Sequence, residues 1–195
     1  MHRTTVELTA ALPWITGVAT DAGTVQLIVR RPAPDAREVL PTAQLDTHVG
    51  LVGDTWAARP SRLTADGGPH PGMQVTLMNS RLVEFIAGER ERWPLAGDQF
   101  YVDLDLGVDN LPAGALVQIG QAVLEISDAP HNGCAKFTQR FGLDAMHFVN
   151  SADGKHHRLR GVNARVVVGG PVTTGDTVTV LVPPTGEADR ARPPA

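Results

Sequence analysis

Short apolar runs alternate with turn residues along most of the chain. Glycine and proline, which mark turns, number 20 and 15 among the 195 residues. Runs of β-branched and other apolar residues between such turns are typical of β-strands. The pattern predicts strands over residues 25–30, 74–78, 100–106, 115–119, 122–126, 162–168 and 177–182.

The alternation of apolar and polar positions is clearest in residues 100–106. One face would carry Phe100, Val102, Leu104 and Leu106, and the other Tyr101, Asp103 and Asp105. Gly120-Gln121 should join its flanking strands as a hairpin, and strand 162–168 should pair with strand 177–182. Such mostly local connections predict a mainly β fold with short helices, closed into a barrel, to which residues 1–44 add further strands.

Two segments carry helix signals instead. Asn79 or Ser80 can begin a helix with one apolar face, and Gly88 can end it. A second short helix should follow the only cysteine and end at Gly142, and residues 143–149 should extend it after that break.

Composition and charge exclude several classes of function. The net charge of −4 provides no basic footprint for nucleic acid or for an anionic membrane. The sequence has neither an apolar stretch of transmembrane length nor a signal-peptide core, so we expect a cytoplasmic protein. A single cysteine cannot form an internal disulfide or a Cys-rich zinc site. We expect one domain over residues 1–182 and a disordered tail over residues 183–195.

The strongest candidate for chemistry is the segment PHNGCAKFTQRFG at residues 130–142, which contains the only cysteine, Cys134. At the start of a helix, unpaired N–H groups and the helix dipole would favour its thiolate, and Lys136 and Arg140 would add positive charge. A thiolate serves as a nucleophile, a sulfur carrier or a soft-metal ligand. The alternative is an inert core cysteine. His131, three residues earlier, is a candidate base for Cys134.

This segment, the run RLRGVNARV at residues 158–166 and the turn-rich residues 169–176 together resemble the molybdenum cofactor sulfurase C-terminal (MOSC) domain. Further pieces fit the same family in the same order, namely residues 50–54, 74–79 and 109–114. The resemblance covers most of residues 45–182 and implies a MOSC-type β-barrel.

The resemblance also implies a set of site residues. Cys134 would carry sulfur or bind molybdenum, with His131 as its catalytic neighbour. The cofactor-binding side chains would be Lys136, Arg140, Arg158, Arg160 and Asn110. Molybdenum held by a pterin dithiolene is thiophilic, and arginine suits the pterin phosphate. We therefore expect Lys136 and the three arginines to converge on one pocket near Cys134.

Three interpretations of the function remain open at this stage. The chain could hold the molybdenum cofactor, as a molybdenum-dependent oxidoreductase does. It could instead be a sulfur transferase, in which Cys134 accepts a persulfide from a cysteine desulfurase and serves a molybdoenzyme. The third interpretation is a binding module without chemistry. Pyridoxal phosphate is not expected here, because the chain shows no desulfurase domain to surround Lys136 or Lys155, its only lysines.

Overall fold

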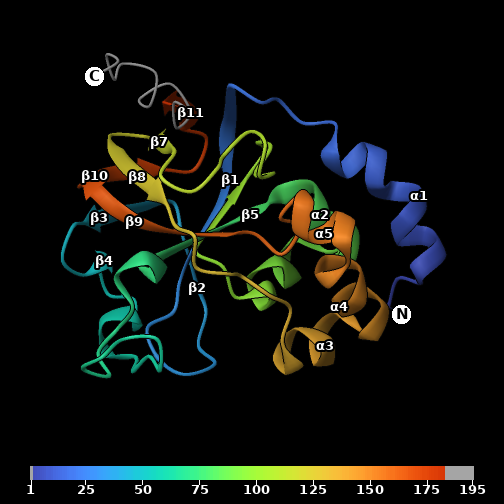
Figure 1. Ribbon diagram of the computed structural model, residues 1–195, viewed down its shortest axis with the longest axis horizontal. Coiled ribbons are helices and arrows are strands. Elements are labelled where there is room, and N and C mark those ends of the chain that lie inside the picture. Colours follow the sequence, from blue (N-terminus) through green and yellow to red (C-terminus); the bar gives the residue numbers. More distant parts are fainter. Residues whose placement is uncertain (1, 183–195) are drawn as a thin grey trace, which may run out of the picture.

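A closed β-barrel forms the centre of the molecule. The computed structural model describes residues 2–182, apart from the side chain of Val182. Seven strands follow one another around the barrel and close where the last meets the first (Figure 1). In spatial order they are β11 (Thr177–Val182), β7 (Leu116–Ile119), β8 (Ala122–Ile126), β9 (Val162–Val168), β5 (Val75–Asn79), β6 (Phe100–Val102) and β1 (Ala22–Arg30). All pairs are antiparallel except β5 with β6.

Smaller elements surround the barrel. Strand β2 (Glu38–Leu40) extends the sheet beside β1, and β10 (Gly170–Thr173), β3 (Thr42–Asp46) and β4 (Gly50–Leu51) form a separate small sheet. The α-helices gather on the opposite side of the barrel from the small sheet (Figure 1). They are α1 (Thr5–Thr16), α2 (Ser80–Ala87), α3 (Ala135–Phe141), α4 (Leu143–Asn150) and α5 (Ala152–His156). Short 3-10 helices cover Trp56–Ala58, Pro71–Met73 and Arg90–Ala96.

Two apolar clusters lie on the two faces of the barrel wall. Phe100 and Val102 point into the barrel, whereas Tyr101 between them packs in the outer cluster with residues from the helices. Leu77 and Met78 divide in the same way on the adjacent strand β5. These strands are apolar on both faces because the helices cover their outer face.

The predicted fold class is confirmed, and the strand predictions are largely confirmed with two corrections. The strand expected over residues 100–106 ends at Val102, although Leu104 and Leu106 still pack in the barrel core. The expected pairing of strand 162–168 with strand 177–182 is wrong. Strand β9 pairs with β8 and β5, and β11 pairs with β7 and β1, while β10 between them turns away to β3.

The helix predictions are confirmed, but two helices were not predicted. Asn79 caps α2, Gly88 follows it with a positive φ, and Gly142 separates α3 from α4. Helix α1 lies where only barrel strands were expected, and α5 lies in a segment that resembles a polar turn. Thr4 and Glu7 form a capping box at the start of α1, which the sequence pattern allowed. The expected tail, residues 183–195, lies outside the described residues.

Candidate functional site

Cys134 is the N-cap residue of helix α3 and is exposed. Its side chain makes no capping hydrogen bond, while its carbonyl oxygen accepts from the Thr138 amide at 2.9 Å. The predicted position at a helix start is confirmed, and the exposure of the side chain argues against the alternative of an inert core cysteine. The thiol is therefore open to a ligand or a reactive partner.

The backbone before Cys134 is fixed by Asn150, at the end of α4. The Asn150 Oδ1 accepts from the Gly133 amide at 2.9 Å, and its Nδ2 donates to the Gly133 carbonyl at 3.2 Å. A Cβ at position 133 would lie 3.0 Å from Val149 Cγ2, so a side chain there would crowd Val149, and glycine suits this close approach. Sequence reasoning missed Asn150, which lies 17 positions from Gly133.

His131 and Arg160 both bind Asp98, a fully buried carboxylate that sequence reasoning also missed. His131 Nε2 lies 2.7 Å from Asp98 Oδ1, and Arg160 Nη1 donates to Asp98 Oδ2 at 2.6 Å. Arg160 also donates to the Ala96 carbonyl and lies over the Phe137 ring, 5.0 Å from its centroid. The helix that carries Cys134 thus packs directly on this buried charge group.

The electrostatics of this group define the state of His131. Burial disfavours the Asp98 carboxylate, but the charges of Arg160 and His131 and their hydrogen bonds hold its pKa at about 2. Burial and the nearby Arg160 cation lower the pKa of His131 more than Asp98 raises it. At neutral pH the ring is therefore neutral, and its Nε2–H donates to the ionised Asp98. Its other nitrogen, Nδ1, is then left with a lone pair that can accept a proton.

Lys136 and Arg140 converge on a different carboxylate, Asp35, in the loop after β1. Lys136 Nζ donates to Asp35 Oδ1 at 2.7 Å, and Arg140 Nη2 donates to the same oxygen at 3.3 Å. Lys136 and Asp35 line a cavity of about 440 Å³ together with Arg37 and Arg59. The Nε of Arg37 is buried and has no hydrogen-bond partner among the described residues.

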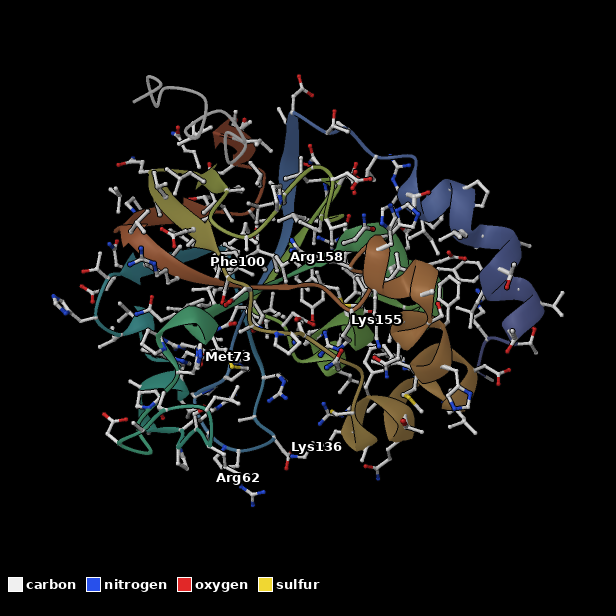
Figure 2. All side chains as sticks on the ribbon, viewed as in Figure 1. Arg62, Met73, Phe100, Lys136, Lys155 and Arg158 are labelled. Atoms are coloured by element: carbon white, nitrogen blue, oxygen red, sulfur yellow. The ribbon has the colours of Figure 1, made fainter. Side chains whose placement is uncertain are left out.

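Arg158 and Arg160 line a second cavity, of about 350 Å³, which is also bordered by His131. The four cations that were expected to share one pocket are thus divided, with Lys136 on one cavity and Arg158 and Arg160 on the other, and that prediction is wrong. In Figure 2, Arg158 and Lys155, which belongs to α5, lie toward the middle of the view, whereas Lys136 lies at the lower edge near α3.

Asn110, the remaining predicted cofactor residue, uses its side chain to hold a loop. Its Nδ2 donates to the carbonyls of Thr20 and Asp105, each at 2.8 Å. Its assignment to the cofactor stays a prediction.

Among the described residues, no three His, Cys, Asp or Glu side chains are grouped to hold a metal ion. Within residues 2–182, no helix is both long and apolar enough to cross a membrane.

Solved structures share this fold at low sequence identity. YuaD from Bacillus subtilis aligns with a TM-score of 0.55 at 15% identity, over 80% of this chain and 94% of its own. YiiM from Escherichia coli aligns with a TM-score of 0.53 at 18% identity, over 82% of this chain and 70% of its own. A hypothetical protein aligns with a TM-score of 0.59 at 18% identity, over 89% and 74%. No curated protein sequence is significantly similar to this chain.

The family model for the MOSC domain matches residues 70–179, a stretch that makes up more than half of the 195 residues. The match includes Cys134, His131, the whole lining of the cavity of Arg158 and Arg160 and five of the seven barrel strands in full. Of the residues that line the Lys136 cavity, it includes Lys136 alone. With the barrel and the cysteine segment in place, the chain belongs to the MOSC-domain family.

Proposed function

We propose that this protein binds the molybdenum cofactor and that Cys134 is the protein ligand to the metal. The observation that carries the proposal is the exposed thiol at the start of α3. The backbone before it is fixed by the contacts of Asn150 to Gly133, and Lys136, two residues after it, lines a cavity with other cations. Membership in a family associated with this cofactor supports it. A thiolate is a suitable ligand for a soft metal, and one such ligand suffices when a pterin dithiolene supplies the others.

The donors around the Lys136 cavity fit the anionic part of the cofactor. Lys136 and Arg37 line it, and the buried, unpartnered Arg37 Nε–H is a donor that a phosphate oxygen would satisfy. Burial and the charges of Arg140 and Arg31 lower the pKa of Arg37, so an added anion would be favoured there. When bound, the cofactor would supply a redox-active molybdenum centre next to the thiol.

His131 would act as a proton acceptor in this proposal. Its Nε2 is tied to Asp98, which fixes the ring and leaves Nδ1 as a proton acceptor. His131 lies three residues before Cys134 on a backbone held by Asn150, so it is the candidate to accept a proton in a reaction at the thiol.

The test is the metal content and the metal's ligands in protein purified from a host that makes the cofactor. We expect near-stoichiometric molybdenum, and X-ray absorption at the molybdenum edge should report one sulfur ligand fewer in Cys134→Ser. Arg62→Ala, at an exposed position, is the matched control. It should keep both the metal and the full sulfur coordination, two sulfurs from the dithiolene and one from Cys134. Stoichiometric molybdenum with unchanged sulfur coordination in Cys134→Ser would contradict the role of the cysteine.

A sulfur carrier is the second candidate function, favoured by the exposure of the same thiol. A desulfurase persulfide would pass its outer sulfur to the Cys134 thiolate, leaving a thiol on the desulfurase and a persulfide on Cys134. The apo-protein would be incubated with cysteine and pyridoxal phosphate, with and without a desulfurase. A persulfide mass shift on Cys134 that needs the desulfurase would favour this function. No shift in either case would favour the molybdenum ligand.

A further inference from the structure

Two residues that line the second cavity, of about 350 Å³, each carry a buried polar atom without a partner among the described residues, and the two atoms are of opposite character. Arg160 and Asn163 are 6% and 1% exposed, and both line the cavity. Arg160 Nε, a donor, and Asn163 Oδ1, an acceptor, are without hydrogen-bond partners among the described residues. Unpaired buried polar groups cost free energy, so they mark places where a ligand or water completes the hydrogen bonding.

The other polar atoms of both side chains already form hydrogen bonds, which fix the positions of Arg160 Nε and Asn163 Oδ1. Arg160 holds Asp98 and the Ala96 carbonyl through its other nitrogens. Asn163 Nδ2 donates to the carbonyls of Ala129 and Pro130 at 3.1 and 3.3 Å. The amide orientation of Asn163 follows from these two acceptors, so its Oδ1 is the atom left to accept.

The charge that lines the cavity is positive by about one unit. Lys155 and Arg158 contribute two cations and Asp128 one carboxylate, while Arg160 is balanced by Asp98. Arg158 has a left-handed backbone, with φ of 44°, which is uncommon for a residue with a side chain and often occurs at functional sites. A singly charged anion would balance the cavity.

We propose that this cavity binds a small hydroxycarboxylate that is distinct from the cofactor. The carboxylate would accept from Arg160 Nε–H and balance the charges of Lys155 and Arg158. A neighbouring hydroxyl would donate to Asn163 Oδ1. The volume suits a small molecule. The inference does not depend on the proposed function, because its observations all lie in the cavity of Arg160 and Asn163.

A comparison of two anions of equal charge distinguishes recognition of the hydroxyl from general electrostatic attraction. Glycolate carries the hydroxyl, and acetate does not. Each would be titrated at constant ionic strength into the full-length protein, with the amide signals of Gly154 and Gly161, which line the cavity, as reporters. Glycolate should bind about fivefold more tightly than acetate, because one hydrogen bond to a buried acceptor contributes about 1 kcal/mol.

Variants show whether the anions bind in this cavity. Both substitutions are at exposed positions, so the protein should still fold. Lys155→Ala, at an exposed position, should weaken both anions several-fold while keeping the preference for glycolate. Arg62→Ala removes the same charge far from Arg158 in Figure 2 and should change neither affinity. Equal affinity for acetate, no saturable shifts at Gly154 and Gly161, or tighter binding of inorganic phosphate at these signals would overturn the proposal.

Discussion

The two ion-pair groups beside the Cys134 segment are built in opposite ways. Arg160 is paired with a carboxylate, Asp98, that is fully buried, and both charges lie beneath α3. Lys136 is paired with Asp35, and each side chain is 61% exposed. When a buried pair loses one partner, an unpaired charge is left in the protein interior, which costs several kcal/mol. An exposed pair can exchange one partner for a ligand with little loss of free energy, because water solvates both charges.

The difference separates positioning from binding. The Asp98 group holds His131 and Arg160 in place and so sets the surroundings of the cysteine segment. The Asp35 group leaves Lys136 available to an incoming anion, because its ion-pair partner is an exposed carboxylate, whereas Arg140 is also held by the Leu95 carbonyl at 2.8 Å. In sequence the arginines look equivalent, yet their roles follow from burial.

Replacement of Asp98 should have the largest effect on stability. Asp98→Asn leaves Arg160 buried without its counter-ion, so the free energy of unfolding should fall by about 3–5 kcal/mol. Urea denaturation monitored by tryptophan fluorescence would measure it. Asp35→Asn is the matched control, and its unfolding free energy should equal that of the unmodified protein. Similar stabilities for the two variants would break the comparison.

Acid should weaken the buried group before it affects the exposed one. Because the pKa of His131 is lowered in the folded protein, the unfolded chain takes up that proton first as the pH falls. The stabilisation is complete above the ordinary histidine pKa of about 6.5 and is lost below it. Asp98, with its pKa at about 2, gives stability that is complete above 3.8 and lost as the pH falls through about 2.

The measurement is the free energy of unfolding between pH 7 and pH 5. It should decrease over this range, and His131→Asn should reduce the slope. His48→Asn, at an exposed position, serves as the control and should keep the original slope. If the slope survives in His131→Asn, the lowered pKa of His131 does not govern the acid response.

Removal of the Asn150 contacts should have a smaller effect that reaches the cysteine. Asn150→Ala loses both hydrogen bonds to Gly133, so the free energy of unfolding should fall by about 1–2 kcal/mol. Alkylation of Cys134 should become faster, because the backbone before it is freed. Gln139→Ala, on the exposed part of α3, should change neither quantity. Unchanged alkylation in Asn150→Ala would show that Asn150 does not position the thiol.

Local patterns predicted the strands and the place of Cys134, because caps and glycines act over a few residues. Asn79 at the start of α2 and Gly142 at the end of α3 are examples. The partners of the site were not predictable in this way. Asp98 lies 33 positions from His131 and 62 from Arg160, and neither periodicity nor composition indicates which carboxylate will be buried.

The same limit explains the division of the cations between two cavities. The shared pocket was expected because the family resemblance placed the basic segments of Lys136 and of Arg158 and Arg160 on either side of one cleft. The barrel instead places Asp35, which is 101 positions from Lys136, beside α3, and α5 beside Arg158. Long-range pairing of strands decides these neighbours, and a single sequence does not contain that pairing explicitly.

The smallest effect on stability is expected at Lys136, where the consequence should appear in anion binding. Lys136→Ala should leave the unfolding free energy unchanged, because its ion pair with Asp35 is exposed and screened. Inorganic phosphate, followed through the amide signals of residues 135–137, should bind about tenfold more weakly, since a hydrogen bond to a charged group contributes about 1.5 kcal/mol. Asp35→Asn should act in the opposite direction and tighten phosphate binding, because it frees Lys136 and Arg140. Arg62→Ala removes one exposed charge elsewhere and should leave phosphate affinity within error. If Lys136→Ala and Asp35→Asn shift the affinity in the same direction, the exposed pair is not a ligand-exchange site, and the contrast with the buried Asp98 group loses its functional meaning.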